Sequence, residues 1–299
     1  EFARTSRPVA IRRKEHASPG HIMWDDDSSR EVISPDVLLR WSRGTVADAL
    51  DDDPLTAPAG PVPFAINSAM NTKVVFTRAP LWALEVDAIV VGNNESLNDR
   101  AGATGEVFRR AGPELELEVQ RLEGCRTGES RLTAGYTLPA THIVHTVGPR
   151  YQPRFASAAE CALHWCYRSA LHLCREHRLR TVALCQVHTE RRGYPLEEGA
   201  HVALRTVRRF LERWPAVLDL VVFVLPSQAE EEAYARLAPL YFPRVRAEVA
   251  AAAAALPSEL GDEDGERHLP ERRLRVGSSP GAPPMAGSGG LGGIGGAGG

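Results

Sequence analysis

The sequence predicts an α/β fold with three layers, in which helices cover both faces of a mostly parallel central sheet. From Lys73 onward, short apolar runs alternate with longer segments of helical periodicity, and this alternation implies helical crossovers between parallel strands. Residues 181–187 and 221–225 are apolar without alternation, as expected of strands that are covered on both faces.

The predicted elements follow one another between residues 72 and 240. The segments with strand character are 72–76, 86–91, 141–147, 181–187 and 218–225. The segments with helical character are 106–122 (interrupted near Gly112 and Pro113), 156–177, 199–214 and 229–240. The helix at 199–214 has one apolar stripe at helical spacing, which consists of Ala200, Ala203, Leu204, Val207, Phe210, Leu211 and Trp214.

The chain of 299 residues divides into three parts. Residues 1–62 are rich in proline and acidic clusters, and we expect a mostly disordered leader in which a short helix could begin after Ser34, with Pro35 suited to its first turn. Residues 63–245 carry the domain. Residues 246–299 lack a core-forming pattern and end in a glycine-rich run, which predicts a disordered low-complexity tail.

Composition excludes several classes of protein. The net charge of −3 creates no global field that selects nucleic acid or an anionic membrane. No apolar run approaches the roughly 18 residues of a membrane span, and the N-terminus lacks an apolar signal core, so we expect a cytoplasmic location without membrane insertion. The five cysteines form no C-x-x-C pair and are expected to be reduced. Cys161 and His164 share a helical face, but zinc needs about four ligands, so neither a metal site nor a cofactor is expected.

Three stretches together resemble a known family. NNESL lies at 93–97, GCRTGESRLTAGYTLPATHIVHTVGP at 124–149, and RRGYPLEEGAHVALRTVRRFL at 191–211. In this order and spacing they resemble the macro domain family, which implies the three-layer α/β/α macro fold. The segments NESL, GCRTGE and GYPLE are most similar to a member in which a lipid-binding domain of the CRAL-TRIO type follows the macro domain. This sequence stops before such a domain, so we do not carry that function over.

The resemblance implies an ADP-ribose-type cleft at the carboxyl ends of the strands, where an aspartate recognises the adenine. The position of that aspartate falls on Ala79 and Pro80, which offer no side-chain acceptor. The family's strand end N-A-A-N corresponds here to V-G-N-N at 91–94. Asn94 matches the last asparagine, and it either points into the cleft or bonds only to its own loop.

The resemblance also implies two phosphate-binding loops. In the first, at 100–104, Gly102 and Ala103 remain as candidates with Gly105 nearby, because glycine lets backbone N–H groups approach a phosphate. Thr104 takes the place of an acidic residue that assists water attack in hydrolases, and threonine cannot act as a general base near neutral pH.

The second loop supplies further candidate ligand-binding residues, namely Thr189, Glu190, Arg191, Arg192 and Gly193. Arg192 stands where the family has an aromatic residue that packs on the distal ribose. Glu190 would repel a diphosphate, whereas the two arginines would attract it. The alternative is that both arginines are solvated loop residues.

Three functions remain open. The favoured one is a non-catalytic macro domain with a degenerate cleft, which binds an ADP-ribose-related nucleotide or poly-adenosine RNA weakly or acts as an interaction module. The second is an ADP-ribosyl hydrolase that removes mono-ADP-ribose; Thr104 argues against it. The third is a scaffold without a small ligand.

On the scaffold hypothesis, a protein or RNA partner would use a basic face of the 199–214 helix, made by Arg205, Arg208, Arg209 and Arg213. Such a run can equally be a solvated helix face. Cys125 and His145 would form a catalytic dyad only if they were adjacent in space, and we expect both to be buried for structural reasons.

Overall fold

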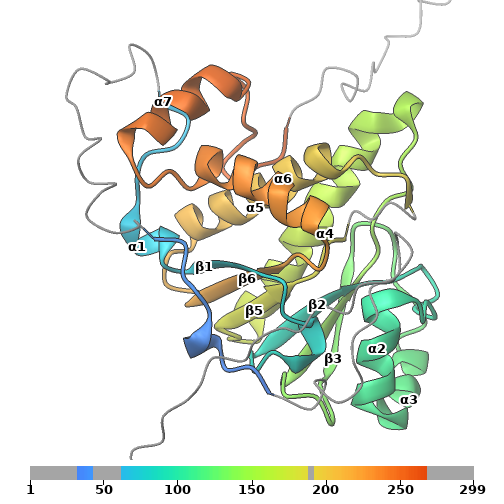
Figure 1. The fold of residues 1–299 in the computed structure, drawn as a ribbon. Coiled ribbons are helices and arrows are strands. Elements are labelled where there is room, and N and C mark those ends of the chain that lie inside the picture. The colour runs from blue at the N-terminus through green and yellow to red at the C-terminus, as the bar shows by residue number, and fades with distance from the viewer. Residues whose placement is uncertain (1–31, 43–61, 188–191, 268–299) are drawn as a thin grey trace, which may run out of the picture. The chain divides into compact units, whose positions relative to one another are not determined.

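A computed structural model describes residues 32–42, 62–187 and 192–267 (Figure 1). Its sheet has six strands in the order β1-β6-β5-β2-β4-β3. The strands are β1 (Val74–Thr77), β2 (Ala88–Gly92), β3 (Ser130–Ala134), β4 (His142–Thr146), β5 (Thr181–Leu184) and β6 (Leu220–Val224). All neighbouring strands are parallel except β3, which pairs antiparallel with β4 at the sheet edge. The predicted mostly parallel sheet is confirmed.

Helices cover both faces of this sheet (Figure 1). One face packs against α4 (Ala156–Glu176), α5 (Leu196–Arg213) and α6 (Gln228–Tyr241), and the other against α2 (Gly102–Ala111) and α3 (Pro113–Arg121). The short helix α1 (Ser68–Asn71) precedes β1. The predicted three-layer arrangement is therefore confirmed.

Strand β2 shows how the sequence builds two cores from one sheet. Ala88 and Val90 pack in the cluster on the α4–α5 side, whereas Ile89 and Val91 pack in the cluster on the α2–α3 side. Side chains of successive strand residues point to opposite faces, so an uninterrupted apolar run fills both clusters. β2 thus lies in the middle of the molecule, and its carboxyl end is fixed from both sides.

The predicted helices form, with small shifts at their ends. The break near Gly112 separates α2 from α3, because Gly112 has a φ of 94° and Pro113 begins the next helix. In α5 the predicted stripe is buried from Ala200 to Leu211. Burial of each large side chain in this stripe contributes about 1.5–3 kcal/mol.

Part of the predicted leader belongs to the packed structure. Ile33 bridges Leu84, and the backbone N–H of Trp41 donates to the carbonyl of Val74 in β1 at 2.8 Å. Between them, Ser34 caps one turn of 3-10 helix, η2 (Pro35–Val37). Residues 32–42 therefore cover the edge of the sheet at β1. The rest of the leader lies outside the described residues.

The packed chain also continues past residue 245, where the sequence analysis placed the end of the domain. Helix α7 (Arg246–Ala255) buries Val249 and Ala252, and Leu256 and Leu260 follow it into the core. Beyond them, residues 261–267 lie against α4 and α5 through ion pairs such as Arg168 with Asp264. The boundary at 245 is thus too early, because alanines and paired charges give no recognisable core pattern in the sequence. The tail from residue 268 lies outside the described residues.

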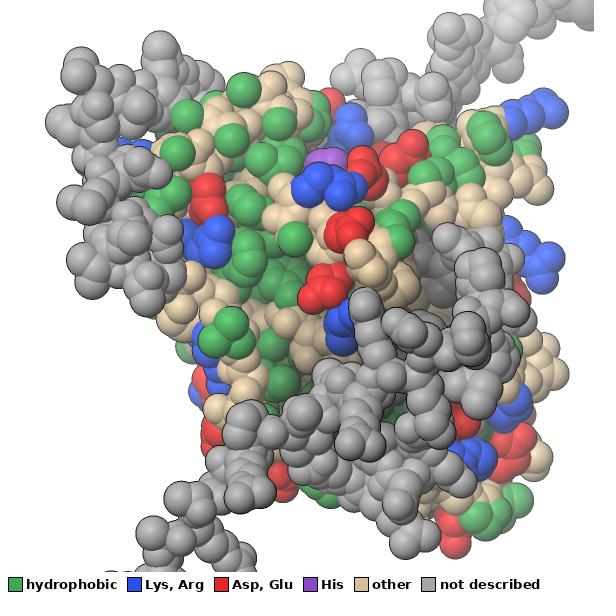
Figure 2. All heavy atoms as spheres, in the orientation of Figure 1, with side chains coloured by type: hydrophobic (Ala, Val, Ile, Leu, Met, Phe, Trp, Pro, Cys, Tyr) green, Lys and Arg blue, Asp and Glu red, His purple; other side chains and the backbone are tan. Residues whose placement is uncertain are grey.

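No helix among the described residues is both long and apolar enough to cross a bilayer. On the described part of the face drawn in Figure 2, acidic and basic side chains lie interspersed, next to one another. This mixed surface agrees with the small net charge of −3.

Candidate functional site

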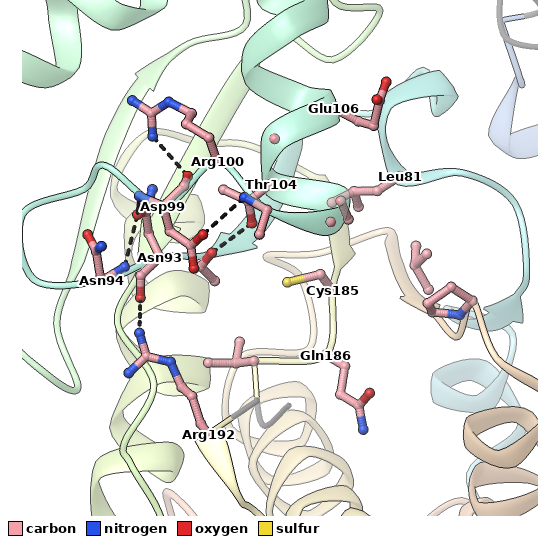
Figure 3. Close-up of a pocket in the computed structure, with 18 of the residues that line it drawn as sticks. Leu81, Asn93, Asn94, Asp99, Arg100, Thr104, Glu106, Cys185, Gln186 and Arg192 are labelled. Atoms are coloured by element: carbon pink, nitrogen blue, oxygen red, sulfur yellow. Dashed lines mark hydrogen bonds between the residues drawn. The ribbon is translucent and has the colours of Figure 1, made fainter. Parts of the chain in front are cut away.

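A cleft of about 1390 Å³ opens at the carboxyl ends of the parallel strands (Figure 3). Its walls come from the residues that follow β1, β2, β4, β5 and β6, together with the first turn of α2. Ligands of open α/β sheets bind at this edge. The fold thus brings together Asn94, Gly102, Ala103, Gly105 and Arg192 from the predicted site.

At the end of β2 the two asparagines have different roles. The side chain of Asn94 is tied to Asn98, donating to its Oδ1 at 2.6 Å and accepting from its backbone N–H at 3.0 Å. The side chain of Asn93 is 1% exposed, and its Oδ1 accepts from the backbone N–H groups of Asn94 and Asp99. Of the two predicted alternatives for Asn94, the structure shows the bond to its own loop.

Asn93 has a buried donor without a partner beneath the cleft wall. Because its Oδ1 accepts two backbone hydrogen bonds, the orientation of its amide is fixed, and its Nδ2 has no hydrogen-bond partner in the described structure. The sequence analysis missed this residue. A signal was present, since Asn93 continues the alternation of Ile89 and Val91 on one face of β2.

Arg192 lies in the cleft and connects two strand ends. Its Nη1 donates to the carbonyl of Gly148 after β4, and its Nη2 donates to the carbonyl of Asn93 after β2, both at 2.6 Å. The alternative of a solvated loop arginine is therefore wrong for Arg192. No carboxylate of the described residues pairs with this guanidinium, so its charge is held in place by carbonyl dipoles.

The first turn of α2 forms another wall. Gly102, Ala103 and Gly105 line the cleft, and this turn contains no acidic residue. A Cβ on Gly105 would lie 2.1 Å from the carbonyl oxygen of Arg100, so only glycine fits there. The backbone N–H groups of a first helical turn have no partners within the helix, and such a helix end favours an anion.

Thr104 does not provide a free catalytic group. Its hydroxyl donates to the carbonyl of Gly92 at 2.7 Å (Figure 3). This bond joins α2 to the end of β2. Thr104 is buried, which agrees with a positioning role.

Three carboxylates line the cleft among the described residues, and each accepts hydrogen bonds from its own surroundings. Asp99 accepts from the backbone of Ala101, Glu230 from the backbone of Ser227, and Glu106 from two arginines of α2. The hydrogen bond from Arg109 is the largest cause that lowers the pKa of Glu106. Burial raises the pKa of the Cys185 thiol, which also lines the cleft, to about 12.

The part of the cleft wall that follows β1 is made of apolar residues. Ala79, Pro80, Leu81 and Trp82 line it. Ala79 and Pro80, which take the position of the implied adenine aspartate, have no polar side-chain atom.

The remaining candidates of the second loop are only partly visible. Thr189, Glu190 and Arg191 lie outside the described residues. Gly193 has a φ of 68° and directs the chain from Arg192 into α5, but it does not line the cleft. Glu197 and Glu198 occupy the first turn of α5.

The sequence analysis also missed Arg150, Tyr151 and Gln152, which line the cleft directly after β4. They follow Gly148 and Pro149, the point at which the sequence marks the end of that strand. Parallel strands end at the same sheet edge, so this position could have identified them.

Cys125 and His145 are buried with separate partners. Burial raises the pKa of Cys125 to about 11 and lowers the pKa of His145 to about 3. The His145 ring is hydrogen-bonded to Thr133 at 3.0 Å. The prediction that both are buried is confirmed.

Cys161 and His164 each have a protein partner. The thiol of Cys161 donates to Glu266 at 3.2 Å, and the ring of His164 is hydrogen-bonded to Thr206 at 2.9 Å. Within the described ranges, no three His, Cys, Asp or Glu side chains converge as metal ligands.

The expected basic face of α5 is half buried, and its two partly exposed members are paired: Arg209 with Glu212, and Arg213 with Asp264. Arg205 is 3% exposed and Arg208 is 2% exposed. Arg205 donates to Glu160 and to the carbonyl of Gly265. Arg208 donates to Glu212 and to the carbonyls of Tyr241 and Ala65. The expectation of a basic surface of four free arginines is wrong, because two are buried and all four pair with carboxylates, several of them on segments distant in the sequence.

Comparison with known proteins agrees with this architecture. The family model for the Macro domain matches residues 90–203. A protein from Nematostella vectensis named as a GDAP2 homolog is 48% identical over 219 residues, covering 73% of this chain and 43% of that protein. Human ganglioside-induced differentiation-associated protein 2 is 41% identical over 260 residues, covering 87% of this chain and 50% of that protein. The chain therefore spans about half the length of these relatives, and the resemblance of its NESL, GCRTGE and GYPLE segments to this group is confirmed.

Solved structures lead to the same family. The crystal structure of the GDAP2 macro domain has a TM-score of 0.64 and 42% identity, with 72% of this chain and 98% of that chain covered. A Trypanosoma brucei macrodomain in complex with ADP-ribose has a TM-score of 0.55 and 31% identity, with 71% and 82% covered. On the combined evidence of fold, cleft and sequence, the chain belongs to the macro domain family.

Proposed function

We propose that this macro domain is a non-catalytic module whose cleft binds a nucleotide-like ligand weakly. The observation that carries the proposal is the composition of the cleft. It is open, its strand-end side holds the Arg192 guanidinium, the first turn of α2 lines it, and its carboxylates already accept protein hydrogen bonds. A guanidinium without a carboxylate partner among the described residues and a helix N-terminus both favour a ligand with anionic oxygens, such as a phosphate.

Size and relationship support a nucleotide. Small-molecule sites commonly have volumes of roughly 300–1,000 Å³, and this cleft is larger, at about 1390 Å³. The related Trypanosoma brucei macrodomain was solved in complex with ADP-ribose and with ADP. An ADP-ribose-related nucleotide or an oligo-adenosine is therefore the ligand class to test.

Weak binding follows from the missing contacts. Ala79 and Pro80 cannot accept a hydrogen bond from an adenine amino group, and the Asn94 amide is already bonded to Asn98. We expect a dissociation constant on the order of 100 µM for ADP-ribose, which corresponds to about 5.5 kcal/mol of binding free energy.

Absence of catalysis is the second part of the proposal. The hydroxyl of Thr104 is committed to the Gly92 carbonyl, and threonine cannot take a proton from water near neutral pH. The thiol of Cys185, with a pKa of about 12, is not a nucleophile under the same conditions. The five cysteines are free thiols, which supports the expected cytoplasmic location.

Isothermal titration calorimetry with ADP-ribose, ADP and oligo-adenosine tests the binding. We expect weak binding that falls about tenfold in Arg192→Ala, since charge-assisted hydrogen bonds contribute about 1.5–3 kcal/mol. Arg121→Ala is the matched control, because α3 contributes no residue to the cleft. Tight, stoichiometric capture of ADP-ribose would contradict the altered-cleft proposal, and silence toward all three ligands from folded protein would favour a scaffold.

A separate assay addresses hydrolysis. Incubation with a mono-ADP-ribosylated protein should release no ADP-ribose. Release that is abolished by Asn94→Ala would establish a hydrolase and overturn the non-catalytic part of the proposal.

A further inference from the structure

The segment Arg150–Phe155, with the sequence RYQPRF, forms one rim of the cleft between β4 and α4. Its first three residues line the cleft, and its last three form the 3-10 helix η6 (Pro153–Phe155). The backbone N–H of Tyr151 donates to the carbonyl of Arg192 at 2.9 Å, and that of Phe155 donates to the carbonyl of Gln152 at 2.8 Å. The rim is therefore fixed to the strand-end side of the cleft.

Two aromatic rings are held on this rim. Phe155, the N-cap residue of α4, is 53% exposed. Tyr151 is packed against Tyr194, with 4.9 Å between ring centroids, and its hydroxyl donates to Glu198. The rim thus presents an exposed phenyl ring at one end and, at the other, a tyrosine whose orientation is fixed by Tyr194 and Glu198.

The rim is also positively charged. Arg150 and Arg154 are exposed, and neither forms an ion pair with a carboxylate of the described residues. The Arg154 guanidinium lies 5.5 Å from the centre of the Phe155 ring. Glu198, bound to the Tyr151 hydroxyl, is an opposing charge beside the rim.

Aromatic rings that alternate with unpaired arginines are typical of surfaces that bind single-stranded nucleic acid, because bases stack on the rings while the cations follow the phosphates. We propose that residues 150–155 form a stacking platform for a single-stranded oligonucleotide that extends out of the cleft. Continuity supports this occupant, since Arg150, Tyr151 and Gln152 belong to both the rim and the cleft. This inference rests on the proposed nucleotide binding, because a nucleotide in the cleft fixes where the oligonucleotide starts.

Fluorescence anisotropy with a labelled oligo-adenosine of about ten nucleotides tests the platform. Phe155→Ala should weaken oligonucleotide binding about tenfold, since one stacked base contributes roughly that much, whereas Phe155→Trp should preserve it. ADP binding, measured in parallel by calorimetry, should stay unchanged in both variants. The control is Leu117→Ala on α3, which removes an apolar side chain that is 57% exposed and lies away from the cleft lining.

The charge of the rim gives a second readout. The double variant Arg150→Ala/Arg154→Ala should reduce the slope of log affinity against log salt by about 1.4, as expected for two phosphates of a single strand. Glu198→Gln should raise the affinity a few-fold, because it removes the opposing charge and keeps an acceptor for Tyr151. Arg121→Ala should change neither quantity.

The outcomes separate this platform from the proposed function of the cleft. If ADP binds but the oligonucleotide binds no better and Phe155→Ala has no effect, the platform is overturned and the cleft function stands. If the oligonucleotide binds through Phe155 while ADP and ADP-ribose do not bind, the platform stands without the cleft. Failure of every ligand overturns both, and stronger competition by poly-glutamate than by unlabelled oligonucleotide would assign the rim to an acidic peptide.

Discussion

Buried arginines of α5 and Arg192 in the cleft have the same side chain in two different surroundings. Arg205 and Arg208 pair with Glu160 and Glu212, and main-chain carbonyls complete their hydrogen bonds. Arg192 contacts two carbonyls and no carboxylate of the described residues. The difference indicates that a neutralised guanidinium joins segments of the fold, whereas one without a counter-charge beside an open cleft is suited to an anionic ligand.

The largest effect is expected where an arginine is both buried and neutralised. Arg208→Ala would leave the buried carbonyl of Tyr241 without its donor and empty the space of a side chain that is 2% exposed, while Glu212 keeps its bond to Arg209. It should lower the free energy of unfolding by about 2–4 kcal/mol. Urea denaturation measures this loss. Arg209→Ala is the matched control, since its side chain is 24% exposed and pairs with the same Glu212, and it should cost at most about 1 kcal/mol. Equal losses would show that burial does not distinguish the two arginines.

A pH-dependent effect should follow from the burial of His164 on α4. Burial lowers the pKa of the His164 imidazole to about 4. The charges of Arg205 and Arg168 act in the same direction, whereas those of Glu266 and Asp262 act against it. An unfolded histidine titrates near 6.5, so between pH 6.5 and pH 4 the unfolded state binds more protons and stability falls with falling pH. At pH 5 the loss relative to pH 7 should be about 2 kcal/mol.

The variant His164→Gln tests this assignment. It keeps an uncharged polar side chain beside Thr206 and should remove that part of the pH dependence, as measured by urea denaturation at pH 5 and pH 7. An unchanged difference between the two pH values would mean that other groups cause the acid sensitivity.

A smaller effect on stability than that of Arg208→Ala is expected in the cleft. Arg192→Ala removes two hydrogen bonds to carbonyls and should lower the free energy of unfolding by about 1–2 kcal/mol, well below the loss for Arg208→Ala. Thermal unfolding with and without ADP-ribose separates this cost from the loss of binding. A loss as large as that of Arg208→Ala would assign Arg192 to the structural class.

Much of the fold was predictable from the sequence, because periodicity records which faces are buried. The strands β1, β2, β4, β5 and β6 and the stripe of α5 follow directly from it. β3 was not predicted, since its residues at the sheet edge are buried without regular alternation. Helix α7 was missed because alanines give only a weak apolar pattern.

The site was less predictable, because a sequence shows charges without their partners. The arginines of α5 suggested a basic surface, yet Arg205 bonds to Gly265 and Arg208 to Tyr241, far along the chain. Asn94 matches a family motif, but its side-chain amide is hydrogen-bonded to Asn98 in the same loop. The amide without a partner belongs to the neighbouring Asn93. The missing adenine contact at Ala79 and Pro80 could be seen from the sequence, since it depends only on residue type.

The contact of residues 32–42 with the outer side of β1 has a practical consequence. The backbone of Trp41 bonds to Val74, and its indole N–H donates to the carbonyl of Phe242. A fragment that starts at residue 63 would lose both hydrogen bonds and leave the edge of β1 uncovered. An uncovered edge strand can pair with a strand of a second molecule. Fragments for crystallisation or binding assays should therefore begin before Val32, so that the edge of β1 stays covered and self-association is avoided. They should also extend through Arg267, so that the ion pair of Asp264 with Arg168 is kept.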